Sequence, residues 1–123
     1  MFTSNTDKLT LTGKSGNSYT FNMCTFDTMD EIDDAVEKFT HAGLYVFAYR
    51  YTKPSDARFW YNIKYIGETE DYSKRDYNNH HKKDDIEKSN ANSWGYCVLS
   101  VSEKDRKALE SDLISYYNPP CNG

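Results

Sequence analysis

The chain has 123 residues, enough for one compact domain and too few for two ordinary ones. Its apolar fraction of 37% is low, but 15% of the residues are aromatic, which predicts an aromatic-rich core and argues against a disordered chain. A net charge of -4 argues against indiscriminate binding of nucleic acid, so any such binding requires a local basic face.

Two further features bear on where the chain works. No run of apolar residues is long enough to span a membrane, and residues 1–14 lack the basic and then apolar pattern of a secretory signal. The three cysteines (Cys24, Cys97 and Cys121) are odd in number and show no CxxC spacing, which argues against a disulfide framework. We therefore expect a cytoplasmic protein of a reducing compartment, with no membrane partner.

The first predicted element is a β-hairpin over residues 8–23. Apolar and polar residues alternate on both sides of a glycine-containing turn at residues 13–16. The pattern is typical of the edge of a sheet, which by itself indicates no chemistry.

The second predicted element is a helix that starts at Thr28 and reaches Phe39. Thr28 and Glu31 have the spacing of a capping box, and Gly43 ends the pattern. Its apolar stripe predicts packing against the core. The acidic residues of the other face are expected to be solvated and to keep this helix away from nucleic acid; they are Asp30, Asp33, Asp34 and Glu37.

The rest of the chain alternates strands and helices. Residues 44–49 and 59–66 read as strands, and a turn at residues 53–56 predicts that they pair as a long antiparallel hairpin. The remaining predicted elements are one or two helices over residues 71–88, a loop over 89–93, a strand over 94–101, and a helix that Ser102 caps and that residues 118–120 end after Tyr117. One α+β domain over residues 1–123 is the expected architecture.

Glu110 stands out on the final helix. Its position places it on the apolar face with Leu113 and Tyr117, whereas Asp112 is expected to point outward. A carboxylate beside a core-facing stripe is costly unless it is paired or binds a cation. An ion pair with Arg106 and a role as a metal ligand are both open interpretations.

Two tripeptides with a tyrosine lie on the two central predicted strands, Gly43-Leu44-Tyr45 and Tyr65-Ile66-Gly67. Arg75 follows the second tripeptide, and Glu110 lies further along on a helix. In this order the motifs resemble those of the GIY-YIG nuclease family, with leucine in place of the first isoleucine. The closing segment Asn118–Asn122 is similar to the asparagine-containing end of the same family.

This resemblance covers residues 43–122 and implies a fold. It implies a small three-stranded mixed or antiparallel central sheet flanked by helices, with residues 43–122 as the catalytic core and residues 1–42 as an added hairpin and helix. Residues 11–16 also look like the start of compact stand-alone bacterial members. The loop between the two tyrosine strands is longer here than in minimal members.

The resemblance also implies an activity, the metal-dependent hydrolysis of DNA phosphodiester bonds. One Mg²⁺ or Mn²⁺ would be held by Glu110, and Arg75 would hold the phosphate through its planar guanidinium. Tyr45 would orient or deprotonate the attacking water with Tyr65 beside it, and Asn122 would fix the site. Many members have a histidine four residues after the arginine. That position is Asn79 here, so either His80 or His81 takes the histidine's role.

The expected partner is duplex or branched DNA. The residues expected to contact it, beside the predicted cleft, are Lys64, Lys74, Arg75, His81, Lys82 and Lys83. The alternative is a catalytically silent module that binds nucleic acid or a protein on the same scaffold, and the joint presence of the motif residues argues against it. A zinc module built from the two histidines with Cys97 and Cys121 fails on spacing.

Overall fold

A computed structural model describes all residues from Met1 to Gly123. The elements, in chain order, are β1 (Thr3–Thr12), β2 (Ser18–Thr25), α1 (Asp30–Ala35), β3 (Gly43–Lys53), β4 (Asp56–Thr69), the 3₁₀ turns η1 (Tyr72–Lys74) and η2 (Tyr77–Asn79), α2 (Lys83–Lys88), β5 (Ser93–Val98) and α3 (Glu103–Tyr117). The α+β class and the order of the predicted elements are confirmed. None of the helices combines the length and the apolar character needed to cross a lipid bilayer.

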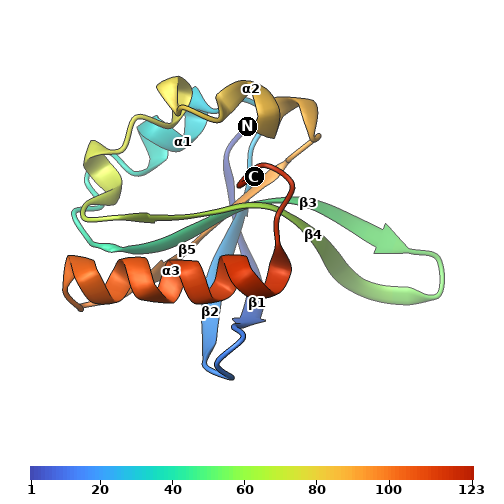
Figure 1. The fold of residues 1–123 in the computed structure, drawn as a ribbon. Helices are drawn as coiled ribbons and strands as arrows, with labels where there is room; N and C mark the ends of the chain where they lie inside the picture. Colours follow the sequence, from blue (N-terminus) through green and yellow to red (C-terminus); the bar gives the residue numbers. More distant parts are fainter.

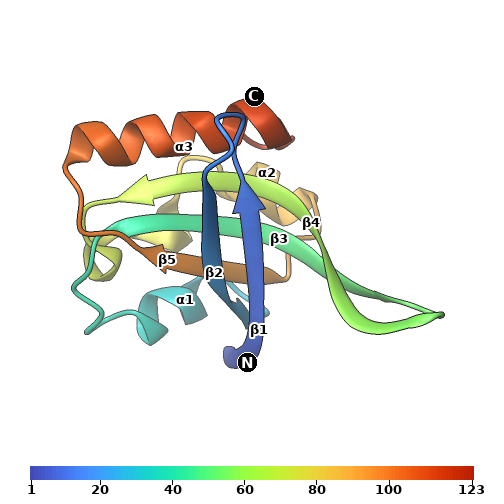
Figure 2. The same cartoon turned by 90° about the horizontal axis from the view of Figure 1, so that it is seen from below.

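The strands form one curled antiparallel sheet in the order β1-β2-β5-β3-β4 (Figures 1 and 2). The expected sheet of three strands is therefore too small. β2 pairs with β5 from Asn22↔Tyr96 to Thr25↔Ser93, so the N-terminal hairpin continues the sheet. The sequence could not show this pairing, because residues that are far apart in the chain make it.

The helices cover both faces of the sheet (Figure 1). α3 lies on one face, and α1, α2 and the 3₁₀ turns lie on the other. Tyr45 and Phe47 of β3 belong to the cluster on the α1–α2 face, whereas Leu44 and Val46 belong to the cluster on the α3 face. Because side chains alternate along a strand, the dense apolar run of β3 fills two cores at once.

The tip of the N-terminal hairpin is fastened to α3. The Asp112 carboxylate accepts hydrogen bonds from the backbone N–H and the hydroxyl of Ser15, at 2.9 and 2.6 Å. The hydroxyl of Tyr117 accepts from the backbone N–H of Thr12 at 2.9 Å. Asp112 thus lies off the apolar face of α3, and it pairs with the hairpin turn that folds back over the helix.

α1 is shorter than predicted and ends at Ala35 instead of reaching Phe39. Glu31 does accept from the backbone N–H of Thr28, at 3.4 Å, but no side chain caps the first turn in return. Asp33 does not stay solvated as expected. It accepts from the backbone N–H groups of Tyr77 and Asn78, at 2.7 and 3.0 Å, and so joins α1 to η2.

Candidate active site

The two tyrosine tripeptides pair across β3 and β4, with Tyr45 opposite Gly67 and Phe47 opposite Tyr65. A Cβ atom at Gly67 would lie 2.3 Å from Cζ and 2.5 Å from Oη of Tyr45, so the phenol ring lies directly over this glycine. A Cβ atom at Gly43 would lie 2.1 Å from the Cys97 carbonyl oxygen. Both glycines of the motif are therefore needed for close packing, and Gly67 makes room for the Tyr45 ring.

His80 and His81 have different environments, which separates their roles. His80 is buried beside Tyr45, and its Nε2 lies 2.8 Å from the Tyr45 hydroxyl oxygen. His81 is exposed and stacks on the His80 ring with 4.6 Å between ring centres. Asn79 turns away and donates to Asp76. His80 is therefore the histidine that reaches the tyrosines.

The two shortest polar contacts of His80 indicate its tautomer. The backbone N–H of Lys82 donates to Nδ1 at 3.0 Å, so a neutral His80 carries its proton on Nε2 and donates it to the Tyr45 oxygen. Burial, then the positive charge of Arg75, then His81 lower the pKa of His80 to about 4. His80 is thus neutral near pH 7 and acts as a donor toward Tyr45.

Burial is also the main cause of the raised pKa values of the two tyrosines, Tyr45 and Tyr65. The pKa of Tyr45 is raised well above its usual value, mainly by burial and then by Tyr65, although Arg75 opposes the shift. The pKa of Tyr65 is raised by burial and then by the negative charge of Glu110, while Arg75 and a hydrogen bond from Tyr45 lower it. Tyr45 is completely buried, whereas Tyr65 keeps 7% of its surface exposed. Of the two phenols, Tyr65 is the one closer to solvent.

Arg75 is the one arginine of the four without an acidic partner. Arg50, Arg58 and Arg106 pair with Asp7, Asp56 and Glu68, respectively. Nη2 of Arg75 lies 3.4 Å from Nε2 of His80, and its guanidinium carbon is 5.7 Å from the centre of the Tyr45 ring. A guanidinium held in place without a carboxylate is free to bind an anion through its planar fork.

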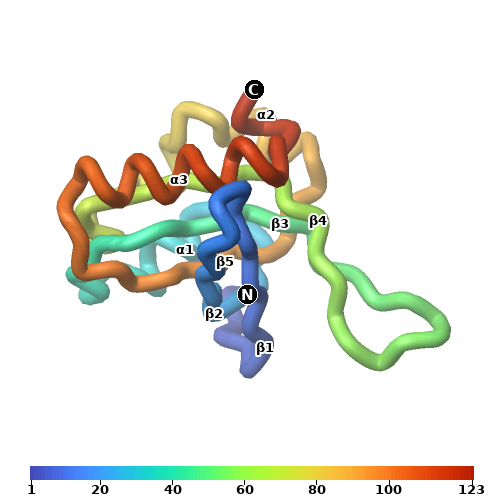
Figure 3. The backbone as a smooth tube through the Cα atoms, turned by 60° about the horizontal axis from the view of Figure 1, so that its bottom comes forward, coloured from blue at the N-terminus to red at the C-terminus, as the bar shows by residue number.

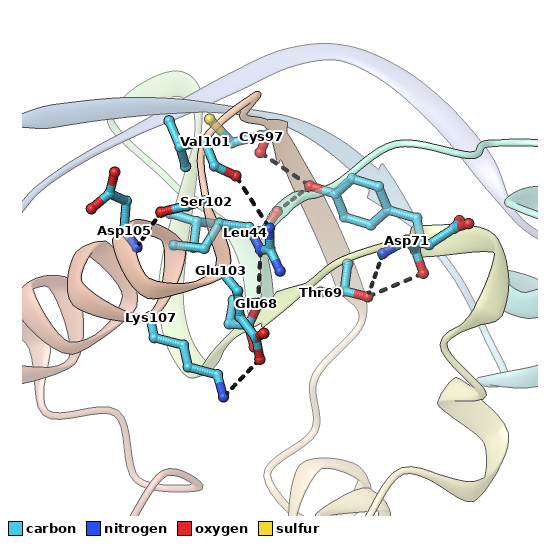
Figure 4. Close-up of polar contacts among 12 residues, drawn as sticks. Leu44, Glu68, Thr69, Asp71, Cys97, Val101, Ser102, Glu103, Asp105 and Lys107 are labelled. Carbon is cyan, nitrogen blue, oxygen red and sulfur yellow. Dashed lines mark hydrogen bonds and ion pairs between the residues drawn. The ribbon is translucent and has the colours of Figure 1, made fainter.

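Glu110 lies on α3, where the helix passes the edge strand β4. Its carboxylate takes part in no salt bridge, and burial followed by the charge of Glu68 raises its pKa. Arg106 does not pair with Glu110 as the sequence allowed. Its Nε donates to Glu68 at 3.0 Å and its Nη1 to the Val101 carbonyl at 3.3 Å (Figure 4). Glu110 is left as a half-buried acid beside a second carboxylate.

This donor set fits a single hard cation bound at Glu110. Glu68 is already neutralised by Arg106, whereas Glu110 has carboxylate oxygens without a cationic partner. Hard divalent cations prefer such oxygen ligands and bind phosphate oxygens and water at their other positions. No group of three or more His, Cys, Asp or Glu side chains is arranged to hold a metal ion. Any metal here would therefore be held by few protein ligands.

Two cavities meet at Arg75 and Lys74. The first, of about 290 Å³, is lined mainly by charged residues that include Glu68, Glu70, Asp71 and Glu103. The second, of about 330 Å³, continues past His80 and His81. Four acids line the first cavity, whereas the second has one acid, Asp76, beside Lys74, Arg75 and the two histidines. A cation and an anion could be bound side by side in such a cleft.

Asn122 braces the strand that carries Tyr65. Its side-chain amide donates to the carbonyl of Ile66 and accepts from the Ile66 N–H, both at 2.9 Å. The preceding Cys121 N–H donates to the carbonyl of Lys64 at 2.9 Å. The closing segment therefore pairs with the outer edge of β4 at Lys64 and Ile66, on either side of Tyr65.

The structure separates the six residues expected to contact nucleic acid. Lys74, Arg75 and His81 line the cleft. Lys82 donates to the Gly123 carbonyl and Lys83 to the Asn78 side chain, each at 3.1 Å, so both are partly engaged at its margin. Lys64 forms a β-bulge in β4, opposite the peptide that joins Phe47 and Ala48. It lines a different groove, which lies between β1 and β4.

Glu68 is the site residue that sequence reasoning missed. It follows Gly67 directly, where an acid on an edge strand normally reads as solvated surface. Only the fold brings it within 3.0 Å of the buried Arg106 and close enough to Glu110 to raise the pKa of that carboxyl. The sequence offered only Glu110 as a partner for Arg106, because the two residues lie one turn apart on the predicted helix.

Comparisons with protein families, with curated proteins and with solved structures find no match to this chain. The resemblance to the GIY-YIG nucleases therefore rests on the motif residues and on their arrangement alone.

Proposed function

We propose that this protein is a metal-dependent endonuclease that hydrolyses phosphodiester bonds in DNA. The observation that carries the proposal is the pairing of two unsatisfied opposite charges in one place. Arg75 has no acidic partner and Glu110 has no basic partner, and Arg75 lies close enough to lower the pKa of Glu110 against the larger effect of burial. An anion bound by the first and a cation bound by the second match a phosphodiester and a divalent metal ion.

The roles of the residues follow from their hydrogen bonds and exposure. Arg75 binds the phosphate and offsets the charge that develops during the attack of water. Tyr65 contacts the attacking water because it is the more exposed phenol and faces the charge of Glu110. Tyr45 supports Tyr65 from its buried position. The resemblance implied the opposite assignment, with Tyr45 at the water and Tyr65 beside it.

The remaining residues position these groups. His80 donates to the Tyr45 oxygen and so orients the phenol whose ring centre lies 6.0 Å from that of Tyr65. Asn122 holds the β4 backbone on the C-terminal side of Tyr65. A Mg²⁺ or Mn²⁺ ion at Glu110 would supply charge stabilisation and a water of lowered pKa when it is bound.

A cleavage assay with Glu110→Gln tests the proposal. Supercoiled, linear, branched and single-stranded DNA are incubated with Mg²⁺, with Mn²⁺ or with a chelator. We expect wild-type protein to cut at least one substrate only with metal, and Glu110→Gln to be slower by at least about a hundredfold because charge stabilisation is lost. Added Mn²⁺ should raise the melting temperature of the wild type but not that of the variant.

Glu87→Gln, on the exposed face of α2, makes the same substitution away from the cleft and serves as the matched control. Circular dichroism verifies that both variants are folded. Equal cleavage by the two variants would remove Glu110 from the mechanism. DNA binding without cleavage of any substrate under any metal condition would instead favour a silent binding module.

A further inference from the structure

The hairpin of β3 and β4 extends well beyond the body of the protein (Figures 2 and 3). β5 pairs with β3 only from Gly43 to Ala48. Residues 49–62 therefore form a two-stranded ribbon without a third strand, which we call the arm. A ribbon of this kind is only marginally stable by itself. Its side chains must contribute to its order.

The arm differs in composition from the rest of the chain. It holds five aromatic residues, three cations and one acid, whereas the whole chain has an excess of acids with a net charge of -4. The cations are Arg50, Lys53 and Arg58, and the acid is Asp56. The arm is thus a locally basic segment of an acidic protein, as a local binding site for a polyanion requires.

Aromatic rings hold the cations of the arm tip in place. The Lys53 ammonium lies 3.6 Å from the centre of the Trp60 ring, and the Arg58 guanidinium carbon lies 4.1 Å from it. The Arg58 side chain is nevertheless 67% exposed, and it has Asp56 as its ion-pair partner. Such surface ion pairs are weak, so a phosphate can compete for this guanidinium.

Arg50 belongs to the base of the arm instead. Its guanidinium lies 3.3 Å from the centre of the Phe59 ring, and its Nε lies 3.7 Å from the Asp7 carboxylate of β1. The hydroxyl of Tyr61 donates to the same carboxylate at 3.1 Å. These contacts anchor the arm to the edge strand β1 and keep its direction fixed relative to the sheet.

We propose that the arm is a DNA-binding element that contacts duplex away from the point of cleavage, an inference that rests on the proposed function. The major groove of B-DNA admits a two-stranded ribbon, and the exposed cations at the tip can contact its phosphates. The rigid aromatic surface limits the entropy lost on binding.

The arm is also correctly placed for this role. β3 runs without interruption from Tyr45 to Lys53, and Tyr49 and Tyr51 share the pleat side of Tyr45. The eight residue-to-residue steps of extended strand from Tyr45 to Lys53 span roughly 26 Å, about eight base-pair steps of duplex. The arm therefore reaches DNA that lies beyond the cleft but on the same molecule.

DNA affinity of the double variant Lys53→Ala/Arg58→Ala tests the proposal. Fluorescence anisotropy with a labelled duplex in EDTA measures binding without cleavage, over a range of salt concentrations. Removal of two phosphate contacts should weaken binding by roughly tenfold and reduce the slope of log affinity against log salt by about two. The matched control is Lys38→Ala/Lys104→Ala, which removes two exposed charges on other elements and should change both quantities much less.

The outcomes separate this proposal from the proposed function. Equal effects of the two double variants would overturn the arm proposal even if the wild type cleaves DNA. Absence of duplex binding by the wild type would overturn it as well. Weaker binding by the arm variant alone supports it, even if no metal gives cleavage and the nuclease proposal fails. A change in sedimentation of the arm variant with unchanged DNA affinity would identify the arm as a contact between two copies, against the proposal.

Discussion

Buried polar groups at the cleft form a directed chain of hydrogen bonds. The Lys82 N–H donates to His80, and His80 donates to Tyr45. Each group has one role in this chain because a neutral imidazole has one donor and one acceptor. A protonated His80 would face the Lys82 N–H with a second donor, so the arrangement depends on His80 being neutral.

Stability should therefore depend on pH through His80. Its pKa in the folded protein is about 4, below the 6.5 of an exposed histidine, so the unfolded chain binds more protons between these values. The stabilisation is present above pH 6.5 and is lost as the pH falls toward 4. The loss amounts to up to about 3 kcal/mol of the free energy of unfolding.

His80→Gln is the variant that isolates this effect, because its amide can still donate to Tyr45 but does not titrate. Urea unfolding of both proteins at several pH values between 7 and 4 gives the difference in free energy. The wild type should lose more stability on acidification than the variant. Parallel curves would mean that His80 titrates in the same way in the folded and the unfolded chain.

At the scale of elements, two asparagine amides substitute for missing strands. Asn92 accepts from the Arg50 N–H at 2.7 Å and donates to the Arg50 carbonyl at 3.2 Å, where β3 leaves the sheet. Asn122 makes the same pair of bonds with Ile66 on the outer edge of β4. Each amide satisfies one backbone N–H and one carbonyl that have no neighbouring strand.

Replacement of these residues should have different consequences. Asn92→Ala leaves two half-buried backbone groups unpaired and should lower the free energy of unfolding by about 1–3 kcal/mol. It should not slow DNA cleavage at saturating metal, since Asn92 lies at the arm and not at the cleft. Asn122→Ala removes the same bonds beside Tyr65 and should reduce both stability and cleavage rate.

Urea unfolding and a cleavage assay on the two variants make this comparison, each serving as the control of the other. The distinction fails if Asn92→Ala slows cleavage as much as Asn122→Ala does. Both amides would then act on the reaction only through overall stability.

At the scale of the whole molecule, the pairing of β2 with β5 makes the N-terminal hairpin an integral part of the sheet. Met23 pairs with Gly95, and a Cβ atom at Gly95 would lie 2.3 Å from the Met23 sulfur. Phe21 and Met23 share one buried cluster with Val46 and Ile66 of the central strands. The hairpin and the central strands β3 and β4 therefore have a common core.

Deletion of residues 1–25 should consequently abolish cooperative folding. The deletion uncovers one edge of β5 and removes Leu11, Phe21 and Met23 from the buried cluster, a loss of several large side chains at about 2–5 kcal/mol each. Near-ultraviolet circular dichroism and urea unfolding of the deleted and the full-length chains provide the measurement. A cooperative transition in residues 26–123 would show that the hairpin is an independent addition.

Local signals explain how much of the fold could be predicted. Alternation predicted the first hairpin, and an apolar run with a turn at residues 53–56 predicted the second. Ser102 predicted the start of α3, where it accepts from the Asp105 N–H at 3.2 Å. Asn118, in the left-handed region with φ 46°, ends the same helix as expected. α1 was overestimated, because Phe39 has helical spacing from Val36 but packs from the loop against Tyr72. Spacing cannot distinguish a helical residue from a loop residue that contacts the same core.

The sequence by itself determined the class of fold, the order of the elements and the set of candidate site residues, since caps, turns and alternation act between neighbours in the chain. Only the tertiary structure decided that all five strands form one sheet, that Arg106 pairs with Glu68, and that His80 rather than His81 reaches Tyr45. These outcomes depend on contacts between distant residues. Such contacts are selected by the packing of both faces of the sheet together, which no local pattern contains.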